Sequence, residues 1–481
     1  MAVLDTPGYQ LQPSAEQVPL STNYITDFNF LNQYLPDTYE KEFERYGNRT
    51  VASFLRLVGA EMPSNSDLIK WAEQGRLHTK YVNCDSSASA AADTATITVS
   101  DVLIPGSGPG SGGIAIRIGQ TVHISNNANI SQYNKGIVTD VDVAAGTFDV
   151  AYYEAGGQTF SGTAVLTVFI YGSEFKKGTL GMEGSLESND VIFENSPIII
   201  KDKYAVSGSD MAQIGWVEIT TENGASGYLW YLKSEHETRL RFEDYIETAM
   251  IEAVPAEVGS GVANQTANSQ VGNKGSEGIF YVVNNRGNVW GGGNPTTLTD
   301  FDAIIQRLDK QGSIEENVIF LDRNFSFDID DMLATLNGYV SGGSAGGASF
   351  GLFDNDVDMA LNLGFSGFRR GYDFYKTDWK YLNDPTLRGG LTVAGQAKIS
   401  GLLVPAGSTT VYDQILGKNA KRPFLHVRYR ASETEDRRYK TWITGSAGGA
   451  TNSSLDAMEV HFLSERAVCT LGANNFFLFG Q

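Results

Sequence analysis

The chain has 481 residues, of which 41% are hydrophobic, and a formal net charge of −20 at pH 7. This length exceeds what one hydrophobic core supports and predicts two to four domains. The acidic balance argues against nucleic-acid binding as the main task, because phosphate contacts need clustered lysine and arginine. No apolar run is long enough for a transmembrane helix, and the N-terminus lacks a signal-peptide pattern. We therefore expect a cytosolic product with no membrane partner.

Residues 1–62 are polar and proline-containing at first, with a short helical pattern only at 43–58. Five aromatic side chains distinguish this segment from an ordinary disordered tail, since disordered segments are usually poor in aromatics. They are Tyr24, Phe28, Phe30, Tyr34 and Tyr39. We expect an N-terminal arm that orders against a neighbour.

Residues 64–82 predict a helix, a stop at Gly75 and then a strand. Ser66 or Asp67 is the expected N-cap, because a short polar side chain can accept from the first-turn N–H groups. This stretch begins the main body of the fold.

Residues 94–172 change character to short, β-branched runs separated by glycine, asparagine and serine. Five strands within so short a segment predict a small closed barrel, which removes exposed strand edges. The turn expected at 143–146 joins two of the strands, and the borders near 85–93 and 105–113 read as linkers. We interpret 85–172 as an inserted β-rich domain.

Residues 173–222 contain two extended runs bridged by Ser207–Asp210. They predict a long two-stranded ribbon, which is only marginally stable alone. We therefore expect the ribbon to lie on another surface, such as another subunit.

The strongest helical pattern runs from Ser226, the expected N-cap, to Val254, just before Pro255. Apolar positions recur at spacings of three and four, which predicts one buried face. That face comprises Leu229, Leu232, His236, Leu240, Ile246, Met250 and Ala253. The opposite, charged face comprises Lys233, Glu235, Glu237, Arg241, Glu243, Asp244 and Glu247. A helix of this length, roughly 40 Å, would act as a spine for the neighbouring elements.

The segment after the spine alternates between helical and strand patterns. Expected elements are a strand at 279–283, a helix at 300–308 capped by Thr299 or Asp300, a strand at 317–322 and a helix at 328–336. Glycine-rich 341–351 predicts a flexible loop. Later segments predict a strand within 400–407, a charged hairpin over 423–443 and two closing strands over 455–480.

No pattern in the sequence identifies a catalytic, cofactor-binding or metal-binding residue. Gly108–Gly113 matches GxGxxG but contains Pro109 and opens no helix, which favours a loop over a nucleotide site. Asp354–Asp358 resembles the start of a calcium loop, but Met359 and Phe365 stand where glycine and glutamate are required. A solvated acidic loop is favoured over a loose cation site.

The histidines and cysteines are also scattered. His78, His123, His236, His426 and His461 form no HExxH motif, and Cys84 and Cys469 form no CxxC motif. We expect His236 to be a salt-bridged or interface residue and the two thiols to be buried and inert.

The richest charge cluster spans His426–Lys440, where basic and acidic side chains alternate. The basic members are Arg428, Arg430, Arg437, Arg438 and Lys440, and the acidic ones are Glu433, Glu435 and Asp436. Two interpretations stay open: a solvated edge protected by charge, or arginine–carboxylate pairing across subunit contacts. A catalytic role is disfavoured.

The order of arm, ribbon, long helix, α/β segment and charged β return resembles the Hong Kong 97-type major capsid fold of tailed bacteriophages. Several short sequence segments are similar to those of the major capsid proteins of crAss-like phages that infect Bacteroidetes. The passages that carry this resemblance are DLIKWAEQGRLHTKY (67–81), VFIYGSEFKKGT (168–179), GYLWYLKSEHETRLRFEDYIE (227–247) and FRRGYDFYKTDWKYLND (368–384).

The resemblance implies an α+β chain with named parts. These are the N-terminal arm at 1–62, the P-domain start at 63–84, the inserted domain at 85–172, the E-loop at 173–222, the P-domain spine helix and following loop at 223–275, the A-domain at 276–420 and the P-domain return strands at 421–481. The insert departs from the minimal fold of the family. No motif locates a covalent cross-link, and a separate scaffold or none is expected.

The resemblance further implies a structural protein of the virion, not an enzyme. Copies would assemble in the host bacterial cytoplasm into hexamers and pentamers of an icosahedral head that encloses double-stranded DNA without specific binding. Accessory or decoration proteins and a portal are the expected partners. The alternatives are a tail or fibre protein, disfavoured by the absence of an internal repeat, and a carbohydrate-active enzyme using Asp328, Asp330 and Asp331.

Overall fold

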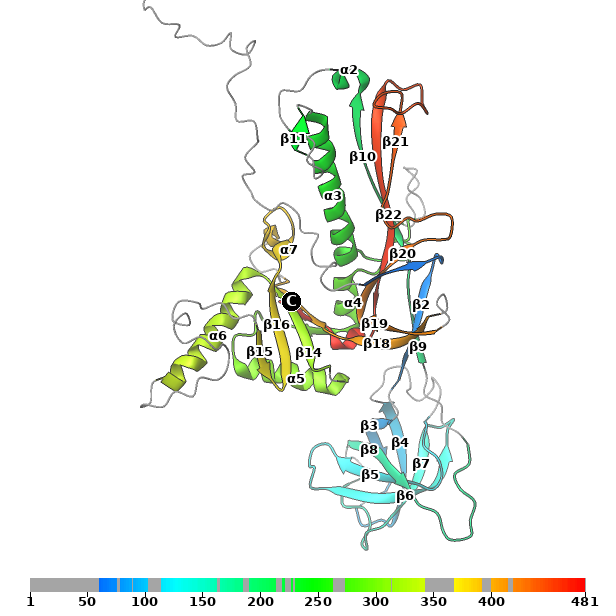
Figure 1. The fold of residues 1–481 in the computed structure, drawn as a ribbon. Helices are drawn as coiled ribbons and strands as arrows, with labels where there is room; N and C mark the ends of the chain where they lie inside the picture. The colour runs from blue at the N-terminus through cyan, green and yellow to red at the C-terminus, as the bar shows by residue number, and fades with distance from the viewer. Residues whose placement is uncertain are drawn as a thin grey trace, which may run out of the picture. The chain divides into compact units, whose positions relative to one another are not determined.

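The computed structural model describes residues 60–480 in two compact units, formed by residues up to 69 together with 195–481 and by residues 70–194 (Figure 1). Within this range the structure does not describe residues 76–77, 89, 103–113, 162–164, 185–189, 213–218, 221–225, 228–229, 263–272, 313, 342–366, 392–398 and 414–417. Most of the predicted arm, the GxGxxG match and the acidic 354–358 segment therefore lie outside the described residues. The domain boundaries drawn from the sequence stay predictions.

The smaller unit contains a closed barrel of strands in the order β3-β4-β7-β6-β5-β8. The strands are β3 (Lys80–Ser86), β4 (Thr94–Val102), β5 (Gln120–Asn126), β6 (Tyr133–Asp142), β7 (Thr147–Tyr152) and β8 (Leu166–Ser173). The expected turn at 143–146 joins β6 to β7, with Gly146 in the left-handed region at φ 69°. The predicted closed barrel is confirmed, with β3 as a sixth strand from outside the predicted insert.

The barrel interior is filled by side chains from alternate positions along its strands. Val122 and Ile124 of β5, and Phe148 and Val150 of β7, are fully or almost fully buried, whereas His123, Ser125, Asp149 and Ala151 are partly exposed. Each such burial contributes about 1.5–3 kcal/mol relative to exposure. The period of two that predicted the strands is thus also what builds the core.

The helix predicted over 64–74 is wrong. Residues Ile69–Gln74 form strand β2, which pairs with β9 (Asp190–Asn195) as a two-stranded sheet. Lys70 pairs with Glu194 at 3.1 Å, and the Trp71 and Phe193 rings lie 6.3 Å apart. Such cross-strand pairs stabilise a strand that local helical periodicity does not predict.

The larger unit contains a sheet in the order β1-β20-β22-β10, with β21 also paired to β22. Its strands are β1 (Ala60–Ser64), β10 (Ile198–Ser207), β20 (Leu425–Arg430), β21 (Lys440–Gly445) and β22 (Ala457–Thr470). The antiparallel β10–β22 ladder is long, running from Ile198 opposite Arg466 to Ser207 opposite Ala457. β1 joins β20 in parallel.

Two predictions about pairing need correction. β10 pairs with C-terminal β22, and a short helix, α2 (Gly208–Met211), stands where the turn of the predicted ribbon was expected. Residues 213–218 of the ribbon's second run lie outside the described residues. β20 and β21 pair with β22 instead of with each other, so the predicted hairpin is reduced to an isolated antiparallel bridge between Ala431 and Asp436. Both errors concern partners distant in sequence, which local patterns do not specify.

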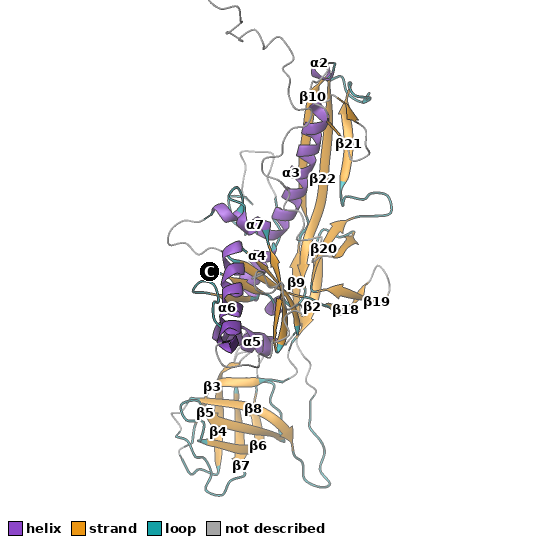
Figure 2. Ribbon diagram, turned by 60° about the vertical axis from the view of Figure 1, so that its left-hand side comes forward, coloured by secondary structure: helices purple, strands orange, loops and turns teal. Residues whose placement is uncertain are grey.

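The predicted spine is helix α3 (Trp230–Glu252), which lies along β10 and β22 (Figure 2). Ser226 is no N-cap, because it belongs to strand β12 (Ser226–Gly227), paired with β11 (Ile219–Thr220). The predicted buried face is confirmed at Ile246 and Met250, but Thr238 and Phe242 are buried as well, and His236 is exposed. Leu240 is only half-buried, and Glu247, expected on the charged face, is 3% exposed. Phe242 packs on Phe462 of β22 at 5.7 Å.

A second sheet has the order β13-β23-β17-β14-β16-β15. Its strands are β13 (Asn288–Trp290), β14 (Glu316–Leu321), β15 (Gly367–Arg370), β16 (Tyr372–Asp378), β17 (Gly401–Pro405) and β23 (Phe477–Phe479). Helices α5 (Leu298–Gln311) and α6 (Arg323–Ser341) share a core with one face. Helix α4 (Ile279–Arg286) and the end of α3 share a core with the other.

Strand alternation explains this layering. Ile319 and Leu321 of β14 join the α5–α6 core, while Phe320 between them joins the α4 core. Smaller elements complete the unit: α7 (Lys380–Asn383), the 3-10 helices Arg388–Gly390 and Ala473–Asn475, and the strand pair β18 (Ser408–Asp413) and β19 (Lys418–Pro423). The predicted mixed α+β class is confirmed.

Two local predictions on this sheet need correction. The strand expected at 279–283 is helix α4, because a short apolar run fits a buried helix as well as a strand. The cap of α5 is Thr297, whose hydroxyl accepts from the Asp300 N–H while the Asp300 carboxylate accepts from the Thr297 N–H. None of the described helices is long and apolar enough to cross a membrane.

Candidate functional site

The charged cluster at 426–440 is placed by the interruption between β20 and β21, which leaves 431–439 as an excursion from the edge of β22. Arg437 pairs with Glu465 at 2.6 Å, Arg430 with Asp67, and Lys440 with Glu435. The Lys440 ammonium lowers the pKa of the Glu435 carboxyl below its ordinary value. These pairs join segments of one chain, an arrangement that neither sequence interpretation described.

The centre of this cluster is a buried arginine that the sequence analysis did not single out. Arg466 of β22 pairs with Glu61 of β1 at 2.7 Å, and its side chain is only 7% exposed. It also donates to the Ser464 hydroxyl at 2.6 Å and to the Arg438 carbonyl at 2.8 Å. Burial lowers the pKa of Arg466, and the Glu61 carboxylate opposes that change. The arrangement braces β1 against the C-terminal strands.

A second group of polar contacts holds the C-terminal end of the spine helix. Glu252 in the last turn of α3 accepts from Arg388 Nη1 at 2.9 and 3.0 Å and from the Tyr381 hydroxyl at 2.6 Å. Burial, followed by that bond to Glu252, raises the pKa of Tyr381. A carboxylate at a helix C-terminus opposes the helix dipole, so it needs a cation. The position of Glu252 at the end of a predicted helix was therefore the feature of the sequence that could have indicated a cationic partner.

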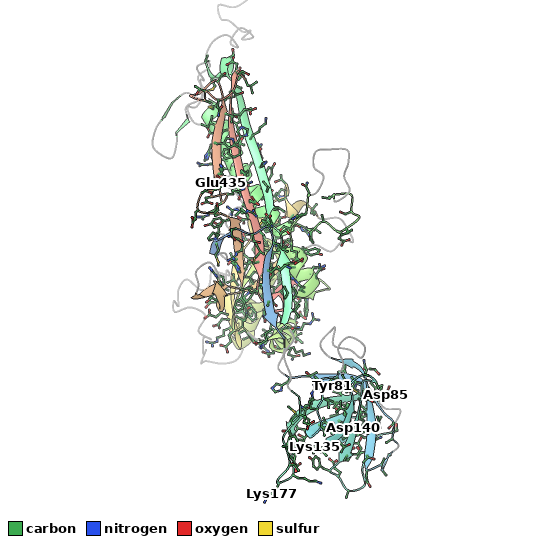
Figure 3. The ribbon with its side chains drawn as sticks, turned by 90° about the vertical axis from the view of Figure 1, so that its right-hand side faces the viewer. Tyr81, Asp85, Lys135, Asp140, Lys177 and Glu435 are labelled. Atoms are coloured by element: carbon green, nitrogen blue, oxygen red, sulfur yellow. The ribbon has the colours of Figure 1, made fainter. Side chains whose placement is uncertain are left out.

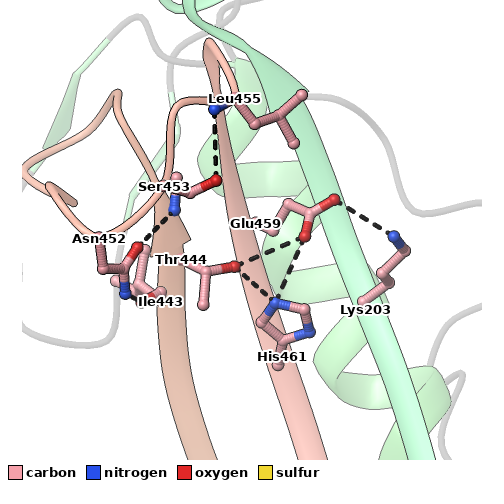
Figure 4. A network of polar contacts seen from close by, with 9 residues as sticks. Lys203, Ile443, Thr444, Asn452, Ser453, Leu455, Glu459 and His461 are labelled. Atoms are coloured by element: carbon pink, nitrogen blue, oxygen red, sulfur yellow. Dashed lines mark hydrogen bonds and ion pairs between the residues drawn. The ribbon is translucent and has the colours of Figure 1, made fainter.

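The polar network on β10, β21 and β22 is the nearest approach to a catalytic arrangement (Figure 4). His461 Nε2 lies 2.8 Å from the Thr444 hydroxyl and 3.5 Å from Glu459, while Glu459 also pairs with Lys203 at 3.2 Å. A hydroxyl–histidine–carboxylate triad uses both ring nitrogens, one toward each partner. Here both contacts fall on Nε2, so the network ties strands together and lacks the geometry of a base that is oriented by an acid.

The carboxylates considered for an enzyme have structural partners. Asp330 pairs with Lys376 at 2.5 Å in a largely buried contact between α6 and β16, and Asp328 accepts from Asn294 at 2.7 Å. Within the described residues, no group of three histidine, cysteine, aspartate or glutamate side chains could hold a metal ion. His236 is exposed and contacts Arg239 at 3.2 Å.

Both cysteines are buried, as predicted. Burial raises the pKa of Cys84 and of Cys469 to about 12, which keeps each as an unreactive thiol at neutral pH.

These observations define a mixed α+β protein with a closed barrel, a helix-braced ladder and charge clusters that tie its strands together. No protein-family description matches the sequence. No curated protein matches it either.

Among solved structures, one from Gordonia phage Cozz is 10% identical, with 98% of each chain covered and a TM-score of 0.39. One from Microbacterium phage Oxtober96 is also 10% identical, covering 95% of this chain and 99% of that one at a TM-score of 0.38. The capsid of a native GTA particle is 8% identical, covering 96% and 99%, at a TM-score of 0.39. Superpositions of this quality do not define a shared fold.

Proposed function

We propose that this chain is a structural subunit of a bacteriophage capsid, of the Hong Kong 97 type and similar to those of crAss-like phages. The observation that carries the proposal is helix α3, which lies along the long β10–β22 ladder. A separate six-stranded α/β sheet accompanies it, and five of its strands lie between α3 and β22 in sequence. This is the order of parts that the sequence resemblance implies.

Exposed apolar side chains give the proposal a physical basis. On β9 and β10, Val191 is 47% exposed, Ile192 66% and Ile199 52%. β9 pairs with β2 alone, and a two-stranded sheet is marginal in water. Apolar side chains at such strands favour burial against another copy. Multivalency in a closed lattice would then add up many modest contacts.

The remaining features of the proposal follow from the same assembly. Copies form hexamers and pentamers of an icosahedral head in the host cytoplasm and become part of the virion. The net charge of −20 suits an inner wall that encloses double-stranded DNA without binding it specifically. Decoration proteins and a portal are the further partners. The chain acts as a shell component without enzymatic activity.

The test is expression of the full chain, alone and with candidate scaffold proteins from the same genome, followed by sedimentation and negative-stain electron microscopy. Closed particles of uniform size support the proposal. Monomers under every condition would contradict it, and fibres would favour a tail or fibre protein. A parallel glycoside-hydrolase assay tests the enzyme alternative, which measurable turnover would support.

A further inference from the structure

The outer face of the barrel carries a row of stacked rings. The His123 ring on β5 lies between Tyr133 of β6, at 5.3 Å, and Phe169 of β8, at 4.9 Å. Both flanking rings are exposed, by 47% and 41%. The barrel core is already filled by the inward side chains of the same strands, so packing within this unit does not account for the row.

Next to these rings is a hollow of 630 Å³, lined by Thr121, Lys135, Tyr153, Glu154, Tyr171, Gly172, Ser173 and Glu174. Tyr153 and Tyr171 are half exposed, at 49% and 50%. Tyr153 donates to Glu174 at 2.5 Å, and the Lys135 ammonium lies 5.8 Å from the Tyr171 ring centre. Figure 3 marks Lys135 among the side chains of the barrel. These contacts hold two ring faces and several polar groups around one hollow.

Two polar atoms on this face lack a partner among the described residues. The hydroxyl of Thr121, which is 5% exposed, and Nδ1 of His123 are buried without a hydrogen bond. Leaving a buried polar atom unpaired is unfavourable, by about 1–3 kcal/mol. At Gly172 an added Cβ would lie 3.2 Å from the Thr121 hydroxyl, so glycine leaves that side uncrowded. Both atoms lie below the accessible surface, so they are polar atoms beneath the hollow and not ligand contacts.

The formal charge of the barrel unit narrows the kinds of ligand that the hollow could bind. Residues 70–194 contain thirteen acidic and seven basic side chains, a formal charge of −6. This balance opposes a polyanion such as single-stranded nucleic acid, which otherwise also stacks on aromatic rings. Exposed rings beside carboxylates, hydroxyls and one ammonium suit a neutral ligand with both C–H faces and hydroxyl groups.

We propose that the hollow beside the Tyr133–His123–Phe169 stack binds a neutral saccharide whose ring hydroxyls are equatorial. The equatorial hydroxyls of such a sugar leave flat C–H faces for Tyr153 and Tyr171. Its hydroxyls donate to Glu154 and Glu174, which have acceptor capacity left, and accept from the Lys135 ammonium. This inference is independent of the proposed assembly, because every residue it uses lies in the barrel unit.

The test measures binding of cellohexaose and of N-acetylglucosamine hexasaccharide to the full chain by titration calorimetry and saturation-transfer NMR. Tyr171→Ala and Tyr153→Ala each weaken binding by about tenfold or more. Tyr375→Ala is the matched control, since Tyr375 is 51% exposed on β16 of the larger unit.

Thermal unfolding of each variant confirms that the barrel remains folded. Failure of both hexasaccharides to bind at millimolar concentration overturns the proposal, as does equal binding by wild type and the two tyrosine variants. An oligo-dT strand is the third probe. If it binds more tightly than either sugar, the face is a nucleic-acid surface and the saccharide assignment is wrong.

Discussion

At the residue scale, Asn195 shows how one buried side chain joins distant segments. Its amide donates to the carbonyls of Val468, at 2.7 Å, and Glu277, at 3.0 Å. Its oxygen accepts from the Ser276 hydroxyl at 3.0 Å and the Glu277 N–H at 2.8 Å. All of its donor and acceptor groups are thus used, with 3% of the residue exposed.

Asn195→Asp keeps the shape but turns two donors into an acceptor facing two carbonyls. We expect a loss of about 2–3 kcal/mol in the free energy of unfolding, because both carbonyls lose a partner and a charge is buried. Urea denaturation of the unassembled chain measures it. Asn294→Asp is the control, since Asn294 makes one partly buried contact with Asp328. A loss at Asn195 no larger than at Asn294 would contradict the assigned role.

His426 predicts a pH dependence of stability. The residue is 6% exposed, and burial lowers its pKa to about 4, with Nδ1 positioned to donate to the Pro423 carbonyl at 3.2 Å. Nearby Arg428 and Arg422 lower the pKa further. Because the folded-state pKa lies below the unfolded value of 6.5, protons favour the unfolded chain, and stability is lost as pH falls from 6.5 toward 4.

Between pH 7 and pH 5 we expect His426 to contribute a loss of about 2 kcal/mol, at 1.4 kcal/mol for each pH unit below the unfolded pKa. Denaturation midpoints of wild type and His426→Gln at both pH values measure this term. The variant is less stable at pH 7 but declines less on acidification. An equal decline in both proteins would show that His426 is not the titrating group.

At the element scale, local patterns predicted the elements whose own periodic signals were strong. The barrel strands and α5 are of this kind, because alternation and a helical period are read within one segment. β2 was misread because its pairing with β9 overrides a helical spacing, and α4 because a five-residue apolar run fits either structure.

Long-range pairing and buried charge pairs were beyond local patterns. The β10–β22 ladder joins residues at least 250 positions apart, and Arg466 meets Glu61 across 405 positions. The sequence showed the charged cluster, but it did not show which of its members form ion pairs within the chain. The barrel hollow could not be predicted from the sequence either, because its lining comes from β5, β6, β8 and the segment after β7.

Helix α3 gives the prediction at this scale. Proline at position 240 lacks the N–H of a helix interior and clashes with the carbonyl of His236, which costs about 3 kcal/mol or more. Because α3 packs along β10 and β22, we expect Leu240→Pro to abolish particles in an assembly assay. Leu240→Ala keeps the helix and serves as the control, with assembly retained. Normal particle yield from the proline variant would refute the role of α3 as a spine.

At the scale of the whole molecule, the chain divides into two units with separate hydrophobic clusters. The barrel cluster includes Phe148, and the α5–α6 cluster of the larger unit includes Phe301. Both rings are buried, at 1% and 0% exposure. Because cooperative unfolding follows contiguous cores, we expect two thermal transitions for the unassembled chain.

Truncation of one ring identifies each transition. Phe148→Ala removes about 3–5 kcal/mol from the barrel and lowers one transition temperature, while Phe301→Ala lowers the other by a similar free energy. Differential scanning calorimetry of the wild type, both single variants and the double variant measures the four cases. Independent units give additive effects, each variant leaving the other transition in place. A single transition shifted by both substitutions would mean that the two cores unfold together.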